Sequence, residues 1–336
     1  MMKRHTRFLA GAMGATLTAL SALSALVGFP PSTGTAVGMT PAPSLRFETL
    51  ARVGLPLSGL VWTGSRFVYT VEGRPQLYAS TPDGKNLRPF ARVPRNGGEM
   101  RCVASPGDHG WPTHALYCHA ADGPIYRIAS GGGAVARFAT VPSPQSSDGA
   151  LAFDTVGRFG YALLAATGGS DSGPGGDVYA ITPEGNTRHV GHYGGPGGAE
   201  NLAIAPAGFG SAAGQALICV DQHDHHGRLL AMDVHGAVRT LVRGLPWGLN
   251  PVVSLVATAP AGGTSGLYIA DWLSRSLLFA PGDQLHAYRG DVFVGAERRG
   301  YMYVVRPNGT GYTVLPIRTN LHAHDYNMEG VAFLAS

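Results

Sequence analysis

The 336-residue chain has little charge, and this shortage limits both its fold and its partners. Charged residues make up 14% of the chain, against 49 glycines and 24 prolines. This composition favours many short strands joined by tight turns over long helices. The formal net charge of +4 includes Lys3, Arg4 and Arg7 of a leader segment, so the rest carries about +4 − 3 = +1. Such a balance gives no basis for binding nucleic acid or an anionic membrane.

Two further features are missing. The sequence contains no Gly-x-Ser-x-Gly motif, so a serine-esterase mechanism built on that nucleophile elbow has no support. After one N-terminal apolar run, no segment is long enough to span a bilayer. The candidate chemistry therefore has to come from polar side chains that the fold of the remaining chain brings together.

The leader has the pattern of an export signal. Its basic residues precede an uncharged, Ala/Leu-rich run from Phe8 to Phe29, which ends at Pro30. The run is long enough for an uncleaved anchor, but small residues such as Ala22 and Ala25 favour cleavage. We predict an export signal at 1–29, a disordered spacer at 30–44 and one domain at 45–336. The mature protein would be secreted or periplasmic, free of the membrane and monomeric.

The chain has only three cysteines. Cys102 and Cys118 lie on either side of a polar turn centred on Gly110, so pairing of the flanking strands would place them face to face. Export to an oxidising compartment permits a disulfide between them, and two separate buried thiols are the alternative. Cys219 is left as a small apolar strand residue.

A hairpin pattern recurs along the chain, in which an apolar strand, a turn rich in Gly, Pro or Asp and a second strand follow one another. The spacing between the first four hairpins is about 50 residues, and two further strands precede each hairpin. Four short strands at this period form one propeller blade, and a blade needs neighbours to cover its two apolar faces. The hairpins lie at 77–93, 125–141, 178–193, 229–244 and 301–317.

We predict an all-β fold, a β-propeller of six blades with four antiparallel strands each. A strand at 47–53 resembles the outer strands of the repeats, and an inner strand lies at the C-terminus, so both chain ends would close the ring. The region 266–317 does not divide cleanly into four-stranded units, which leaves five or seven blades as alternatives. The inner strands are expected to begin near Gly59, Met100, Ala150, Leu202, Val252 and Val331.

Acid and amide side chains open most of these inner strands and would surround the central channel. Converging carboxylates repel one another unless they are protonated or neutralised, and a bound divalent ion would neutralise them. Oxygen ligands suit calcium or magnesium better than zinc, so we predict calcium as the cofactor. The alternative is that these short polar residues only end loops. The candidate ligands are Glu99, Asp148, Glu200, Asn201, Asn250 and Glu329.

A second set of polar residues follows the second strand of each blade and would share the same face. Most of the acids in this set, Glu72, Asp122, Asp221, Asp271 and Glu297, are expected to cap turns. The loop 220–228 contains three histidines, and neighbouring residues of an extended loop are expected to point in different directions. The three imidazoles could not easily bind one zinc ion, so a proton-moving role for His223 is favoured. Indoles here can stack on a sugar or another flat ligand, although packing between blades is the default for either tryptophan alone. The predicted substrate rim consists of His119, Asp221, Trp247, Trp272 and His324.

The segment DGALAFDTVGRFGYALLA (148–165) resembles a blade opening of the gluconolactonase and senescence-marker-protein family, within a superfamily that includes strictosidine-synthase-like propellers. ENLAIAP and MEGVAFL are similar to the Asn-Gly and Glu-Gly openings of that family. The resemblance implies a six-bladed propeller with one divalent ion in the channel. It also implies that lactones or related esters are opened, with Asp148 helping to activate water. Ser58 stands where an acid of the first blade would be expected.

The leading hypothesis is therefore an exported, metal-dependent hydrolase of lactones or similar esters, acting on a small molecule or carbohydrate. A second is a binding propeller for a sugar, a peptide or a surface partner, with a structural ion or none. A third is a quinone-dependent sugar dehydrogenase, in which a rim histidine is the base and calcium holds the cofactor.

Overall fold

Short strands form almost all of the regular structure, and several, such as β4 (Phe67–Val71) and β12 (Leu163–Gly168), are buried on both faces. The computed structural model describes residues 44–94, 98–120, 123–142, 148–168, 174–221, 226–246, 248–255, 263–297, 300–322 and 325–335. The predicted export signal lies outside these residues, as does all of the spacer except Ser44. In the described part of the chain, no helix has the length and hydropathy that a membrane crossing needs.

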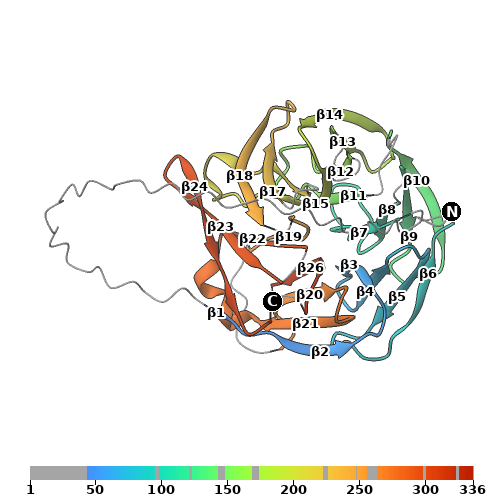
Figure 1. The fold of residues 1–336 in the computed structure, drawn as a ribbon. Coiled ribbons are helices and arrows are strands. Elements are labelled where there is room, and N and C mark those ends of the chain that lie inside the picture. Colours follow the sequence, from blue (N-terminus) through green and yellow to red (C-terminus); the bar gives the residue numbers. More distant parts are fainter. Residues whose placement is uncertain are drawn as a thin grey trace, which may run out of the picture. The chain divides into compact units, whose positions relative to one another are not determined.

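Six four-stranded antiparallel sheets are arranged in a ring (Figure 1), which confirms the predicted six-bladed propeller. In blades 1 to 4 the strands follow the chain from the inner to the outer edge. Blade 1 contains β3 (Leu57–Trp62), β4 (Phe67–Val71), β5 (Gln76–Ser80) and β6 (Arg88–Arg92). Blade 2 contains β7 (Met100–Ala104), β8 (Leu116–Ala120), β9 (Pro124–Ile128) and β10 (Val135–Thr140). Blade 3 contains β11 (Asp148–Phe153), β12 (Leu163–Gly168), β13 (Gly175–Ile181) and β14 (Thr187–Gly194). Blade 4 contains β15 (Gly198–Ile204), β16 (Ala216–Asp221), β17 (His226–Met232) and β18 (Val238–Pro246).

The last two blades are interleaved in the sequence. Blade 5 contains β19 (Val252–Ser254), β22 (Val292–Gly295), β23 (Met302–Asn308) and β24 (Gly311–Pro316). The chain leaves blade 5 after β19, forms the two middle strands of blade 6, and returns to blade 5 at β22. This crossover explains why 266–317 resists division into consecutive units. Blade 6 contains β26 (Met328–Leu334), β20 (Gly266–Asp271), β21 (Ser276–Pro281) and β2 (Glu48–Arg52).

Both ends of the described chain close the ring in blade 6, as predicted. The N-terminal strand β2 pairs with β21 on the outside, and the C-terminal strand β26 pairs with β20 on the inside. The short strands β1 (Ser44–Leu45) and β25 (Arg318–Thr319) pair in parallel. The other elements of the described residues are two 3-10 helices, η1 (Gly210–Ala212) and η2 (Gly282–Tyr288).

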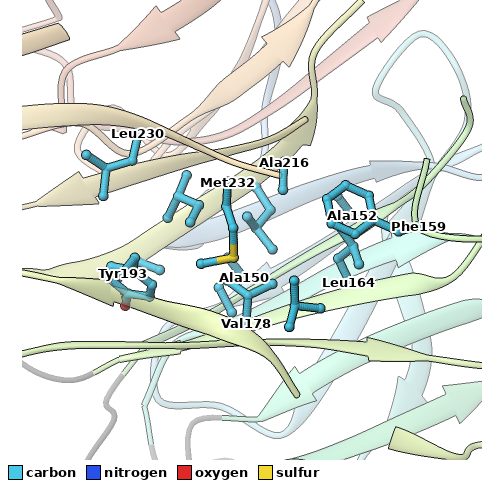
Figure 2. Packing of buried hydrophobic residues seen from close by; sticks show 14 of the residues in the cluster. Ala150, Ala152, Phe159, Leu164, Val178, Tyr193, Ala216, Leu230 and Met232 are labelled. Carbon is cyan, nitrogen blue, oxygen red and sulfur yellow. Dashed lines mark hydrogen bonds between the residues drawn. The ribbon is translucent and has the colours of Figure 1, made fainter. Parts of the chain in front are cut away.

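Side chains that point alternately to the two faces of each strand make the contacts between neighbouring blades. In β11, Ala150 and Ala152 belong to a cluster that also contains Leu230 and Met232 of β17 in blade 4 (Figure 2). The intervening Leu151 belongs to a cluster with aromatic and aliphatic residues of blade 2. Because neighbouring side chains point to opposite faces of a strand, one apolar strand serves two interfaces.

The structure contains a disulfide between Cys102 and Cys118, which lie opposite each other in β7 and β8. Cys219 is a buried free thiol in β16. Burial raises the pKa of this thiol, and the charge of Glu200 acts in the same direction. Cys219 therefore stays protonated and behaves as a small apolar residue, as the sequence suggests.

Inner strands approach each other closely where blades 6 and 1 meet. A Cβ atom at Gly330 would lie 2.6 Å from the main-chain nitrogen of Leu60 and 2.8 Å from the carbonyl carbon of Gly59. The glycine after Glu329 is thus required by the neighbouring backbone. This gives a physical reason for the Glu-Gly pair that opens β26.

We expect Gly330→Ala to destabilise the protein by about 1–3 kcal/mol, because two backbones must separate to accommodate the methyl group. Urea unfolding followed by tryptophan fluorescence measures this change. Gly131→Ala is the matched control, since a Cβ atom there meets nothing within 4 Å, and its effect should stay within about 0.5 kcal/mol. Equal stability of the two variants would contradict the close approach.

Candidate functional site

Polar side chains from four blades meet around the guanidinium of Arg101, the second residue of β7. Arg101 is 5% exposed. Its Nη2 atom lies 2.5 Å from Glu99 Oε2, 3.1 Å from Asn250 Oδ1 and 3.2 Å from both Glu200 Oε2 and Glu329 Oε2. We refer to these five residues, Glu99, Arg101, Glu200, Asn250 and Glu329, as the arginine cluster.

Local irregularities of the inner strands accompany this convergence. Glu200 is the extra residue where the register of β15 shifts between Ala199 and Asn201. Glu329 is the extra residue at the corresponding shift in β26. A bulge re-aims the side chain of its extra residue, here towards Arg101. In β3 the equivalent residue is Ser58, whose hydroxyl donates to Thr70 Oγ1 at 3.2 Å.

Two further hydrogen bonds join the cluster to blade 6. Arg101 Nη1 donates to the main-chain oxygen of Glu329 at 2.8 Å. The amide nitrogen of Asn250 donates to Glu329 Oε2 at 2.5 Å. Arg101 Nε is buried and has no hydrogen-bond partner among the described residues. One arginine thus links blade 2 to blades 4, 5 and 6.

The cluster has an excess of negative charge. Burial alone would lower the pKa of Arg101, but the charges of Glu99, Glu329 and Glu200 outweigh it and raise this pKa above its usual value. Burial raises the pKa of Glu329, repulsion from Glu99 and Glu297 adds to this, and Arg101 opposes it. With all groups ionised, the three carboxylates and one guanidinium carry −3 + 1 = −2. The rise in the pKa of Glu329 reduces that excess.

A cavity of about 980 Å³ lies inside the ring of inner strands. Arg101, Asn201 and Glu329 line it near the starts of these strands. It extends past the far ends of the strands, where its lining residues Thr155 and Arg289 are exposed. Its walls are mostly apolar and include Leu60, Val61, Trp62, Val103, Leu151, Phe153, Leu202, Ile204, Val252, Val253, Val331 and Phe333.

The donor set at the blade openings fits a guanidinium better than a divalent ion. Oxygens of Glu99, Glu200, Asn250 and Glu329 surround the Nη2 nitrogen of Arg101, so they leave no open cage at their meeting point. Within the part of the chain that the structure describes, no group of three or more His, Cys, Asp or Glu side chains is arranged to hold a metal. The calcium ion stays a prediction.

The other predicted site residues are distributed as follows. Asn201 lines the cavity, but its Oδ1 accepts the N–H of Leu202 at 2.9 Å and takes no part in the hydrogen bonds of the cluster. His119 and Asp221 are buried, although they were expected on an accessible rim. His119 packs against Gly149, where a Cβ atom would lie 2.1 Å from its Nδ1. Trp272 donates from Nε1 to Glu72 Oε2 at 2.7 Å.

Some predicted site residues fall outside the described part of the chain. His223, Trp247 and His324 belong to these segments. Asp148 begins β11, but its side chain is not described. The roles predicted for these four residues therefore stay predictions.

Turn capping accounts for two buried aspartates. Asp271 accepts the main-chain N–H groups of Ser274 and Asn327, both at 2.5 Å, and burial raises its pKa. This is the capping role expected for the second rim set. Asp154, which the sequence reading passed over, accepts four main-chain N–H groups between residues 156 and 161 and orders a loop at the open end of the cavity. In the sequence, the Asp-x-x-Gly spacing that follows β11 indicates this capping role of Asp154.

Arg101 is the main functional candidate that sequence reasoning missed. The available signal was a basic residue inside the otherwise apolar strand MRCVA, two positions after Glu99. Residues two apart in an extended segment share a face, so Glu99, directly before β7, and Arg101 could be expected on the same side.

The fold is similar to that of several solved structures. A glucose dehydrogenase matches with 13% identity and a TM-score of 0.56, covering 86% of this chain and 99% of that one. A chain of a nidogen/laminin complex matches with 9% identity and a TM-score of 0.52, over 82% of this chain and 83% of that one. A putative gluconolactonase matches with 14% identity and a TM-score of 0.48, over 87% and 86%. At these identities the similarity to the first two shows the fold alone, and the third, with its lower TM-score, carries no argument. No protein-family model matches the sequence, and no curated protein matches it.

We expect Asn250→Asp to destabilise the protein by about 1–3 kcal/mol at pH 8, and by less at pH 5.5. The substitution places a carboxylate oxygen where the amide now donates to Glu329 Oε2 at 2.5 Å, beside Glu99 and Glu200 and with only Arg101 as a cation. The pKa of the new carboxyl group is therefore raised in the folded state, and the loss of stability grows as pH rises through it.

Thermal unfolding of this variant and the wild type at the two pH values measures the effect. Asn308→Asp, at an exposed hairpin, is the control and should behave as the wild type at both. A pH-independent loss of stability in Asn250→Asp would contradict the charge argument.

Proposed function

We propose that the cavity binds a small molecule with an apolar body and a polar end, and that the protein hydrolyses lactones or similar esters bound there. One observation carries this proposal: an apolar-walled cavity of about 980 Å³ is lined at one end by the buried residues Arg101 and Glu329, which belong to a cluster of one arginine and three glutamates. Cavities of this size and lining, with few convergent polar groups, are typical of small-molecule sites.

The chemistry would take place at the end of the cavity that Arg101, Asn201 and Glu329 line. Asn201 Oδ1 is engaged by the Leu202 N–H, so its amide nitrogen is the group left to donate to a ligand carbonyl. The buried Nε–H of Arg101, which has no hydrogen-bond partner among the described residues, would donate to the oxyanion that develops when water attacks that carbonyl. Glu329 would accept the proton of the attacking water and return it to the leaving alcohol oxygen as the ester bond breaks.

We further propose that the protein acts outside the cytoplasm, on the basis of the leader at 1–29. The sequence also predicts a version in which hydrolysis depends on calcium or another divalent ion. Because Arg101 occupies the meeting point of the candidate ligands, we propose the version without an ion. Assays with and without a chelator separate the two versions. Binding without turnover would instead support a non-catalytic binding propeller.

Glu329→Gln is expected to lower kcat for lactone hydrolysis by about 100-fold or more, because the amide cannot take a proton from water. A panel of lactones with short and long alkyl chains, assayed on the mature protein, measures kcat and KM. The apolar walls predict the better KM for the longer chains. Full activity in this variant would exclude Glu329 as the base.

Ala104→Phe is expected to raise KM or abolish ligand binding, because Ala104 lines the cavity and a phenyl ring would fill part of it. Binding is followed by calorimetry or by inhibition of turnover. Ala136→Phe is the matched control, since Ala136 is exposed on the outer strand β10 and should leave both constants unchanged. If Ala104→Phe folds and binds as the wild type, the ligand occupies another site.

A further inference from the structure

The arrangement around Arg101 Nη2 is that of a small cation in an oxygen shell. Four oxygens from four separate chain segments lie 2.5 to 3.2 Å from this one nitrogen. Three of them belong to carboxylates whose side chains are 22%, 8% and 3% exposed, for Glu99, Glu200 and Glu329. Without the guanidinium, these carboxylates would face one another across a small, poorly solvated space.

We propose that Arg101 is a built-in counter-cation, which occupies the position where a divalent ion would otherwise bind and thereby excludes it. Glu99, Glu200, Asn250 and Glu329 then form a latent divalent-cation site, which opens only when the arginine side chain is removed. Arg101 thereby joins the blades, which is the role that a bound ion would otherwise have.

Exclusion follows from distance and charge. Calcium lies 2.3 to 2.6 Å from its oxygen ligands, so an ion bound by these four oxygens would coincide with the present position of Nη2. The guanidinium is also permanently charged and would repel the ion. The ion and the arginine side chain therefore compete for one place.

Charge also predicts what removal of the arginine would do. Loss of the guanidinium changes the formal charge of the cluster from −2 to −3, while the four oxygen donors stay on their strands. Three carboxylate ligands and one amide oxygen form a hard, anionic site of the kind that calcium prefers. This inference is independent of what the channel binds, because it concerns the stability of the ring.

The test compares the melting temperature of the wild type, Arg101→Ala and Arg101→Lys in EDTA and in a series of CaCl2 concentrations. The wild type should melt at the same temperature in both conditions and carry no stoichiometric divalent metal by elemental analysis. Arg101→Ala should melt lower in EDTA and gain on the order of 4 °C when calcium reaches about 100 times its Kd. Arg101→Lys keeps a cation in place and should show no calcium response.

A second substitution ties the response to the cluster. Adding Glu329→Gln to Arg101→Ala removes one carboxylate ligand and should weaken the apparent calcium affinity at least tenfold. The proposal is overturned if the wild type holds a stoichiometric divalent ion or melts lower in EDTA. It is equally overturned if folded Arg101→Ala ignores calcium, if Arg101→Lys responds as strongly, or if Arg101→Ala folds neither with nor without calcium.

Discussion

The ring depends on one electrostatic constraint: carboxylates that open different inner strands are brought together away from water, and their repulsion has to be offset. In this protein the offset comes from the guanidinium of Arg101, which contacts Glu99, Glu200, Asn250 and Glu329 at once. A planar fork with several donors is well suited to satisfy acceptors that arrive from different directions. The same contacts connect residues that are 228 positions apart in the sequence. The guanidinium of Arg101 therefore both balances the charge of the carboxylates and helps to close the ring.

The cavity follows from the same arrangement. Inner strands that tilt around an axis leave a space lined by their own side chains, and the arginine cluster occupies the end of it where those strands begin. The remaining walls are aliphatic and aromatic, so a ligand would meet apolar surface along most of its length and polar groups at one end only. Resemblance in fold to proteins with different activities adds nothing to this assignment, because function lies in the site and not in the fold.

Most of the fold could be predicted from local pattern. The five hairpins, the six inner strands, the pairing of Cys102 with Cys118 and the closure by both chain ends all depend on strand alternation and turn spacing, which the sequence shows directly. The convergence of Glu99, Glu200, Asn250 and Glu329 could also be predicted, because each opens an inner strand. The role of Arg101 could not be predicted as easily. A basic residue in an apolar strand has no evident function until its partners on the other blades are known. The bulges that direct Glu200 and Glu329 are likewise set by pairing with neighbouring strands.

The interleaving of blades 5 and 6 limits how such a ring can change over evolution. Strands β20 and β21 sit between the β19 and β22 segments of the chain, yet they supply the middle of the sheet that β2 and β26 complete. A duplication or deletion of one repeat-length stretch here would disrupt two sheets at once, whereas in the first four blades it would add or remove a whole sheet. The pair formed by blades 5 and 6 should therefore be inherited as a unit, and variation in blade number among descendants of this chain should arise on the opposite side of the ring.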